Sequence, residues 1–74
     1  MRTLTDSERV ARAYATLNLS PDVSADAALR QYRRLAKQWH PDLYANDPAG
    51  QLDASRRMRQ INAAFAVILS LIHI

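Results

Sequence analysis

The tripeptide His40-Pro41-Asp42 carries the side chains of this chain that are best suited to chemistry or recognition. An imidazole is a directional hydrogen-bond donor and acceptor, and a carboxylate accepts strong hydrogen bonds from a guanidinium group. The proline fixes one backbone dihedral, so a short rigid segment of this kind loses little entropy on docking. No nucleophile stands beside it, and a chain of 74 residues is too small for a deep cleft, which argues against an enzyme. On composition alone, the tripeptide is also typical of a turn that ends a helix.

The composition excludes several other kinds of site. The chain has no cysteine and only two histidines, which are far apart, so we expect no metal site and no cofactor. A formal net charge of +3 and a pI near 10.0 indicate an acidic partner, which charge alone does not identify as protein, nucleic acid or membrane.

The chain shows no targeting or membrane signal in its sequence. Residues 1–8 lack the apolar core of a signal peptide, and residues 61–74 fall short of the roughly 20 apolar residues that a spanning helix needs. We therefore expect a cytoplasmic domain with no membrane segment in this fragment.

The pattern around the tripeptide predicts an all-α chain that begins with a helix ending near Leu17. Thr5 and Glu8 have the spacing of a capping box, in which each side chain satisfies a backbone N–H group at the helix start. Asn18 follows, and asparagine tolerates the left-handed conformation that commonly ends a helix. A short loop should then lead to the second helix.

A second and a third helix flank the tripeptide. Ser24 can cap the second helix, and Pro41 biases the residue before it away from helical geometry, so this helix should end at about Trp39. Asp47 places a capping carboxylate before a proline at the first position of the third helix. Between the two helices, residues 40–46 show no sustained period and should only turn the chain. The helices should pack as an antiparallel hairpin, with the tripeptide exposed at its tip.

Four segments carry a resemblance to a known family. They are Tyr14 to Asp22, Tyr32 to Ala36, Trp39 to Asp42 and Ile61 to Phe65. In this order and spacing they resemble a J-domain, the helical module of DnaJ-type co-chaperones, over about Ala13 to Ile68. A bare His-Pro-Asp is a weak motif, but here it follows a basic amphipathic helix and precedes an Ile-Asn-x-Ala-aromatic helix, which is specific. The resemblance implies a J-domain-like antiparallel hairpin with a packed first helix and, in this chain, no fourth helix.

The resemblance also implies a function and a partner. The domain would bind the nucleotide-binding domain and linker of a DnaK-type heat-shock chaperone and stimulate its ATP hydrolysis, promoting client capture and protein folding. It would act as a monomer, would bind no nucleic acid and would not itself be an enzyme. The chaperone-binding loop would be His40, Pro41 and Asp42. The chaperone-binding basic helix would contribute Tyr32, Arg33, Arg34, Arg30 and Lys37. The family's core positions would be Leu17, Leu35, Trp39, Met58, Ile61, Phe65 and Ile68, with Met58 in place of a usual phenylalanine.

A DNA-binding domain of three helices, with a basic recognition helix in the major groove, is the alternative from another class. It explains the positive charge. It does not explain the tripeptide at the hairpin tip, and the second helix has few side chains that read bases. Tyr32 and Trp39 continue the apolar stripe of their own helix, so we interpret them as packing residues before a platform for stacked bases.

The residues after the tripeptide depart from the family. Leu43 and Tyr44 stand where the family usually has a basic residue and an asparagine. We expect this difference to weaken or redirect docking at that edge of the loop.

The end of the chain departs further. The string Leu-Ser-Leu-Ile-His-Ile at residues 69–74 is what CTG TCT CTT ATA CAC ATC encodes, and it resembles a transposon end used in sequencing-library preparation. We therefore expect the J-domain to occupy residues 1–68, with its core resemblance over 13–68, and residues 69–74 to be a non-native tail on a fragment of a longer protein. The alternative is a genuine, frayed extension of the third helix. Resequencing the source locus distinguishes the two, since an uninterrupted genomic frame encoding this tail would contradict the read-through hypothesis.

Overall fold

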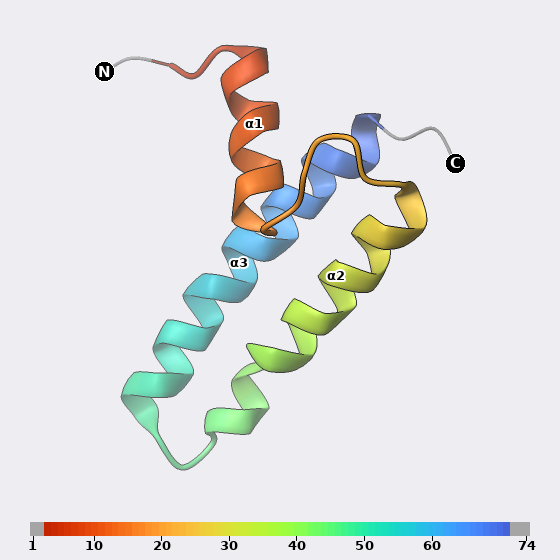
Figure 1. The fold of residues 1–74 in the computed structure, drawn as a ribbon. Helices are drawn as coiled ribbons and strands as arrows, with labels where there is room; N and C mark the ends of the chain where they lie inside the picture. The colour runs from red at the N-terminus through yellow and green to blue at the C-terminus, as the bar shows by residue number, and fades with distance from the viewer. Residues whose placement is uncertain (1–2, 72–74) are drawn as a thin grey trace.

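The fold is all-α, as predicted. A computed structural model of the protein describes residues 3–71, and within that range there are helices and no strands (Figure 1). The tail residues Ile72, His73 and Ile74 lie outside the described residues. The elements in chain order are α1 (Asp6–Thr16), α2 (Ala25–Gln38), the short 3-10 helix η1 (Pro41–Tyr44) and α3 (Pro48–Leu71).

The first helix begins and ends through local side-chain chemistry. The Thr5 hydroxyl accepts a hydrogen bond from the Glu8 N–H group at 3.2 Å, and the Glu8 carboxylate accepts one from the Thr5 N–H group at 3.2 Å. This reciprocal pair is the predicted capping box. Beyond the helix, Asn18 adopts a positive φ of 56°, as its position after the helix predicted.

Replacing Thr5 by alanine should lower the free energy of unfolding by about 1 kcal/mol, because the Glu8 N–H group at the helix start loses its side-chain acceptor. Thermal unfolding followed by far-ultraviolet circular dichroism measures the change. Thr3→Ala is the matched control, since Thr3 is exposed and precedes the helix. Equal effects of the two substitutions would contradict the role of the cap.

The connection between α1 and α2 is tied at both ends. The Gln31 side chain of α2 donates a hydrogen bond to the Leu17 carbonyl oxygen at 3.0 Å, in a partly buried position. Within the loop, the Ser20 hydroxyl donates to the Asp22 carboxylate, which holds the pKa of Asp22 below its ordinary value. The first bond joins α2 to the end of α1, and the second is local to the loop.

The two long helices also begin where predicted, but the turn between them is more regular than expected. Ser24 accepts a hydrogen bond from the Ala27 N–H group at 3.1 Å, and Asp47 accepts one from the Gly50 N–H group at 3.1 Å. The segment expected only to turn the chain contains η1. A proline at the first position and the His40 side chain as cap account for this helix, because they satisfy the requirements of a helix start over a very short span.

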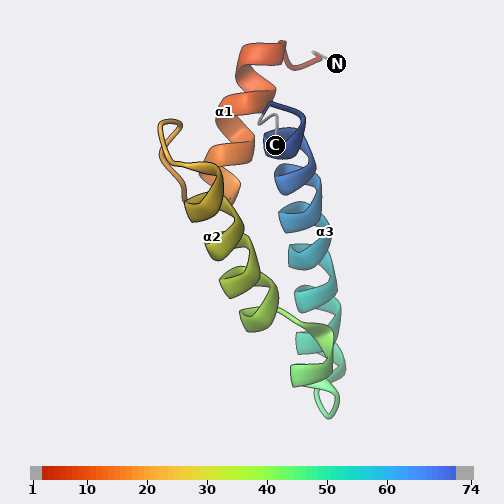
Figure 2. The same cartoon turned by 90° about the vertical axis from the view of Figure 1, so that its right-hand side faces the viewer.

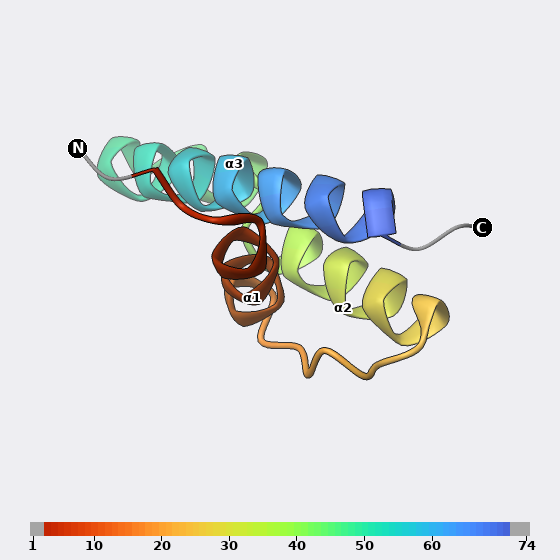
Figure 3. The ribbon, with the colours of Figure 1, turned by 90° about the horizontal axis from the view of Figure 1, so that it is seen from above.

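Helices α2 and α3 form the predicted antiparallel hairpin, with η1 at its tip (Figures 1 and 2). Helix α1 crosses the C-terminal half of α3 at the other end of the hairpin (Figure 3). The buried core cluster lies at this crossing and consists of Ala13, Tyr14, Leu17, Ala28, Ile61, Ala64 and Ile68.

The residues expected at the family's core positions fall into two groups. Leu17, Ile61 and Ile68 are buried, and Leu17 and Ile68 have no exposed surface. The others are partly buried and pack against the cluster, and they are Leu35, Trp39, Met58 and Phe65. Apart from the fully buried Ala54 of α3, the tip half of the hairpin is held by partly exposed side chains, whereas the α1 end has a closed core.

Candidate functional site

The His-Pro-Asp tripeptide forms a compact turn at the tip of the hairpin. His40 is extended, with φ −65° and ψ 127°, and Pro41 is the first residue of η1. The His40 Nδ1 atom accepts a hydrogen bond from the Asp42 N–H group at 3.2 Å, and the His40 carbonyl oxygen accepts one from the Leu43 N–H group at 3.0 Å. The tripeptide therefore folds upon itself and is not an open loop.

The polar side chains of this turn are available to a partner. The His40 side chain is 57% exposed and the Asp42 side chain 89% exposed, and the His40 Nδ1 atom lies 3.6 Å from the Asp42 Oδ2 atom. This contact leaves most of the carboxylate's hydrogen-bonding capacity unused, and a guanidinium group of a partner can satisfy it with two parallel bonds. The exposed carboxylate is thus free to accept hydrogen bonds from a donor outside the turn.

The basic residues of α2 form one exposed face. Arg30, Arg33, Arg34 and Lys37 recur at spacings of three and four residues, which places them along one side of the helix, and all four are exposed. Within residues 3–71, none of the four forms an ion pair. Lys37 lies about one turn before the tripeptide, so this basic face leads to the tip of the hairpin.

Tyr32, which the resemblance places with these cations, points instead toward α3. Its hydroxyl donates a hydrogen bond to the Asn62 side-chain oxygen at 2.7 Å, and its ring stacks on Phe65 with centroids 4.2 Å apart. Tyr32 is therefore only partly exposed and joins the two arms of the hairpin. The sequence signal for this contact was the aromatic residue on the apolar stripe of α2.

Replacing Tyr32 by phenylalanine should lower the free energy of unfolding by about 1 kcal/mol, because the ring stack remains while one hydrogen bond is lost. Urea unfolding followed by circular dichroism measures it. Tyr14→Phe is the matched control, since Tyr14 is buried and no hydrogen bond of its hydroxyl occurs in the described part of the chain. A destabilisation by Tyr14→Phe as large as that by Tyr32→Phe would contradict this assignment.

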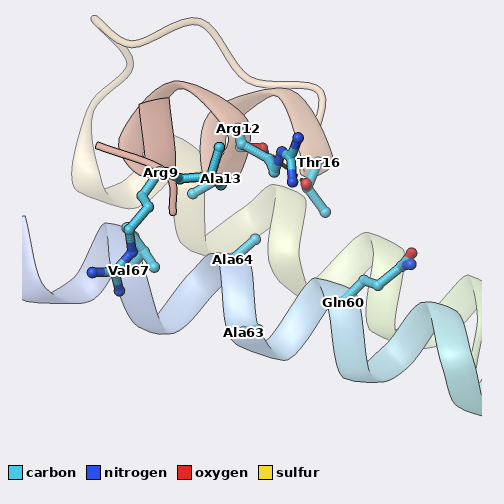
Figure 4. A pocket seen from close by; sticks show the side chains of 9 residues that line it. Arg9, Arg12, Ala13, Thr16, Gln60, Ala63, Ala64 and Val67 are labelled. Carbon is cyan, nitrogen blue, oxygen red and sulfur yellow. Dashed lines mark hydrogen bonds between the residues drawn. The ribbon is translucent and has the colours of Figure 1, made fainter. Parts of the chain in front are cut away.

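An open groove of about 540 Å³ lies between α1 and α3, away from the tripeptide (Figure 4). Arg9 and Arg12 of α1 stand on one side, and alanines at 63 and 64 form its floor. Gln60, which also lines it, lies about 18 Å along α3 from Pro48 at a rise of about 1.5 Å per residue. The groove contains no pairing of a nucleophile with a base, and it does not meet the basic face of α2.

Neither a metal site nor a membrane-spanning helix occurs among the described residues. Among residues 3–71, no three histidine, cysteine, aspartate or glutamate side chains lie close enough together to hold a metal ion. The same range contains no helix of the length and apolarity required to cross a bilayer.

These features define an interaction module, a small helical hairpin that presents a rigid polar turn beside a row of cations. The profile of the DnaJ domain family matches residues 12–70. The chain therefore belongs to the DnaJ domain family.

Curated relatives agree with this assignment. The chain is similar to chaperone protein DnaJ of Hydrogenobacter thermophilus, with 36% identity over 55 residues that cover 74% of this chain and 14% of the relative. It is also similar to chaperone protein DnaJ of Prochlorococcus marinus, with 42% identity over 74% of this chain and 13% of the relative. With DnaJ homolog subfamily B member 3 of Homo sapiens it shares 34% identity over 74% of this chain and 36% of the relative. The chain thus matches only a minor part of the length of each relative. No solved structure matches it significantly.

Proposed function

We propose that this domain is a co-chaperone module that binds a DnaK-type chaperone through His40, Pro41 and Asp42 and the basic face of α2, and stimulates its ATP hydrolysis. The observation that carries the proposal is the exposed, self-bonded His-Pro-Asp turn at the end of a row of four exposed cations. Membership of the DnaJ domain family supports it. The relatives named as DnaJ chaperones support it as well.

The two parts of the surface would act differently. The cations of α2 would attract an acidic patch on the chaperone, raise the rate of encounter and set the register. The tripeptide would then dock near the nucleotide-binding domain and the interdomain linker, where Asp42 can accept hydrogen bonds from an arginine. Because the turn is already folded by its own hydrogen bonds, docking would cost little conformational entropy.

The chemistry would belong to the partner. The domain would bind no nucleotide, and its contribution would be to favour the hydrolysis-competent conformation of the chaperone by binding it more tightly than the resting one. Faster hydrolysis would promote client capture and folding. The domain would act as a monomer in the cytoplasm.

We also propose that residues 1–68 are the native domain and residues 69–74 the read-through tail. Ile68 is the last buried residue of the described chain, and Leu69 and Leu71 are 44% and 46% exposed. Helix α3 itself continues to Leu71, and the family match extends to residue 70. Resequencing of the source locus tests this boundary.

Single-turnover ATP hydrolysis by a DnaK-type chaperone, measured over a range of domain concentrations, tests the proposed function. We expect a saturable increase in the hydrolysis rate. Titration of a labelled DNA duplex in the same buffer tests the alternative function. Sequence-selective DNA binding without any increase in ATP hydrolysis would overturn the proposal in favour of a DNA-binding domain.

A further inference from the structure

The two ends of the His-Pro-Asp turn are joined by an aromatic contact. Trp39 precedes the tripeptide as the C-terminal cap of α2, and Tyr44 is the last residue of η1. Their rings are nearly parallel, at 12°, with centroids 6.4 Å apart, which is an offset stack. The Tyr44 hydroxyl also donates a hydrogen bond to the Gln38 carbonyl oxygen at 3.4 Å. Since the tripeptide lies between these residues in the sequence, the stack closes the turn at its base.

Helix α3 supports this contact from a third direction. The Arg57 Cζ atom lies 4.3 Å from the centroid of the Trp39 ring, within the range of a cation–π interaction. Arg57 is itself held by Asp53, whose Oδ2 atom accepts a hydrogen bond from its Nε atom at 3.2 Å. Trp39 therefore contacts both Tyr44 of η1 and Arg57 of α3.

The first turn of α3 lies directly against the Tyr44 ring. A Cβ atom added to Gly50 would lie 3.1 Å from the Tyr44 Cδ1 atom and 2.4 Å from the Asp47 Oδ2 atom. The glycine therefore gives both the ring and the capping carboxylate the space that they occupy. Tyr44 is in this way confined between the end of α2 and the start of α3.

We infer that Tyr44 is the positioning residue of the chaperone-binding turn, acting through the stack on Trp39. This inference rests on the proposed function. Without the stack, the hydrogen bonds that remain in η1 are short-range and include Leu43 N–H to the His40 carbonyl oxygen and Asp47 N–H to the Tyr44 carbonyl oxygen. A single exposed 3-10 turn is weakly stable by itself, so the turn would populate other conformations. The apparent affinity for a partner falls in proportion to the docking-competent fraction.

The decisive variant is Tyr44→Leu, which keeps an apolar side chain but removes the ring. We expect about a tenfold increase in the concentration that gives half-maximal stimulation of ATP hydrolysis, with the maximal rate at saturation unchanged within about twofold. Tyr44→Phe keeps the stack and should remain within about twofold of the natural chain, since the hydroxyl contact is long. Rescue by phenylalanine is a result that a mere loss of apolar volume does not predict.

Two measurements follow the turn without any partner. Trp39 is the only tryptophan of the chain, so quenching of its fluorescence by acrylamide reports its exposure. Hydrogen exchange of the Leu43 and Asp47 amides, followed by nuclear magnetic resonance, reports the order of η1. In Tyr44→Leu we expect stronger quenching and faster exchange at these amides, with unchanged exchange of the buried middle of α3.

Two controls separate positioning from general stability. Thr5→Ala weakens the domain at the opposite end and should leave the half-maximal concentration unchanged. Arg57→Met removes the cation from the Trp39 ring while keeping an apolar stem, and should raise the half-maximal concentration by about threefold. Arg56→Met is its matched control, since Arg56 is exposed and forms no ion pair in the described residues.

Different results would overturn the role of Tyr44 and the proposed function of the domain. Unchanged amide exchange and half-maximal concentration in Tyr44→Leu would overturn the inference, even with full stimulation by the natural chain. An equal loss of stimulation in Thr5→Ala would overturn it too, since the effect would then follow stability. Absence of stimulation by the natural chain would overturn the proposed function, and faster exchange in Tyr44→Leu would still support the role of Tyr44 in ordering the turn.

Discussion

Replacing His40 by glutamine or Asp42 by asparagine should strongly weaken stimulation of chaperone ATP hydrolysis while the domain remains folded. Asp42→Asn removes a charge-assisted acceptor from a side chain that is 89% exposed, and a hydrogen bond to a charged group contributes about 1.5–3 kcal/mol. The half-maximal concentration should therefore rise by about 10-fold to 100-fold. His40→Gln removes the imidazole whose Nδ1 atom caps the Asp42 N–H group, so it alters both the contact and the shape of the turn.

Each substitution has a matched control within the chain. Asp26→Asn removes an exposed carboxylate from the first turn of α2, and His73→Gln changes the only other histidine. Both controls should stimulate like the natural chain. Circular dichroism should show unchanged helix content in His40→Gln and Asp42→Asn, because both side chains are exposed and contribute little to the core. Full stimulation by folded His40→Gln and Asp42→Asn would contradict the proposed docking surface.

The sequence predicted the parts of the fold that local chemistry determines. Caps at Thr5, Ser24 and Asp47 depend on a side chain and a backbone group a few residues apart, so a residue type at a given spacing is enough to predict them. The positive φ at Asn18 is local in the same sense. The structure confirms these predictions of the helix caps and of the positive φ.

Packing between helices was less predictable. Ala13, Ala28, Ala54 and Ala64 are buried, with exposed fractions of 4%, 0%, 0% and 6%, although the core positions implied by the family resemblance include no alanine. Alanine carries little hydrophobic signal of its own, and its burial depends on how the helices pack against one another, which only the assembled fold determines. For α3, in contrast, the family resemblance placed Ile61 and Ile68 at core positions, and both are buried.

At the candidate site, the sequence identified the tripeptide and the basic residues but not the way the turn is held. The stack between Trp39 and Tyr44, and the approach of Arg57 to the Trp39 ring, join three separate elements. The spacing of Trp39, Tyr44 and Arg57 in the sequence does not show whether their side chains touch or lie apart on the surface. Tyr32 makes a second contact between helices, whose partners the spacing did not predict. The resemblance placed it with the cations, but its side chain contacts Asn62 and Phe65.

Reversing two charges on the basic face, by Arg33→Glu with Arg34→Glu, should raise the half-maximal concentration for stimulation at least about tenfold at low salt. Both arginines are exposed and free of ion pairs in the described residues, so the substitutions remove no internal contact of that kind. The loss should appear in both rates, because the cations attract the partner before contact and the reversed charges repel it after docking. It should also shrink as salt is added, since the Debye length falls from roughly 30 Å at 0.01 M to roughly 8 Å at 0.15 M ionic strength.

The matched control is Arg56→Glu with Arg59→Glu, which changes the net charge by the same amount on exposed positions of α3. If the face of α2 docks on the chaperone, this control should raise the half-maximal concentration by only about twofold to threefold, through the weaker long-range field. Equal losses from the two pairs would mean that net charge, and not the face of α2, governs association. Association and dissociation rates measured by stopped-flow at several salt concentrations decide between these cases, because a docking face alters both rates whereas net charge alters chiefly the first.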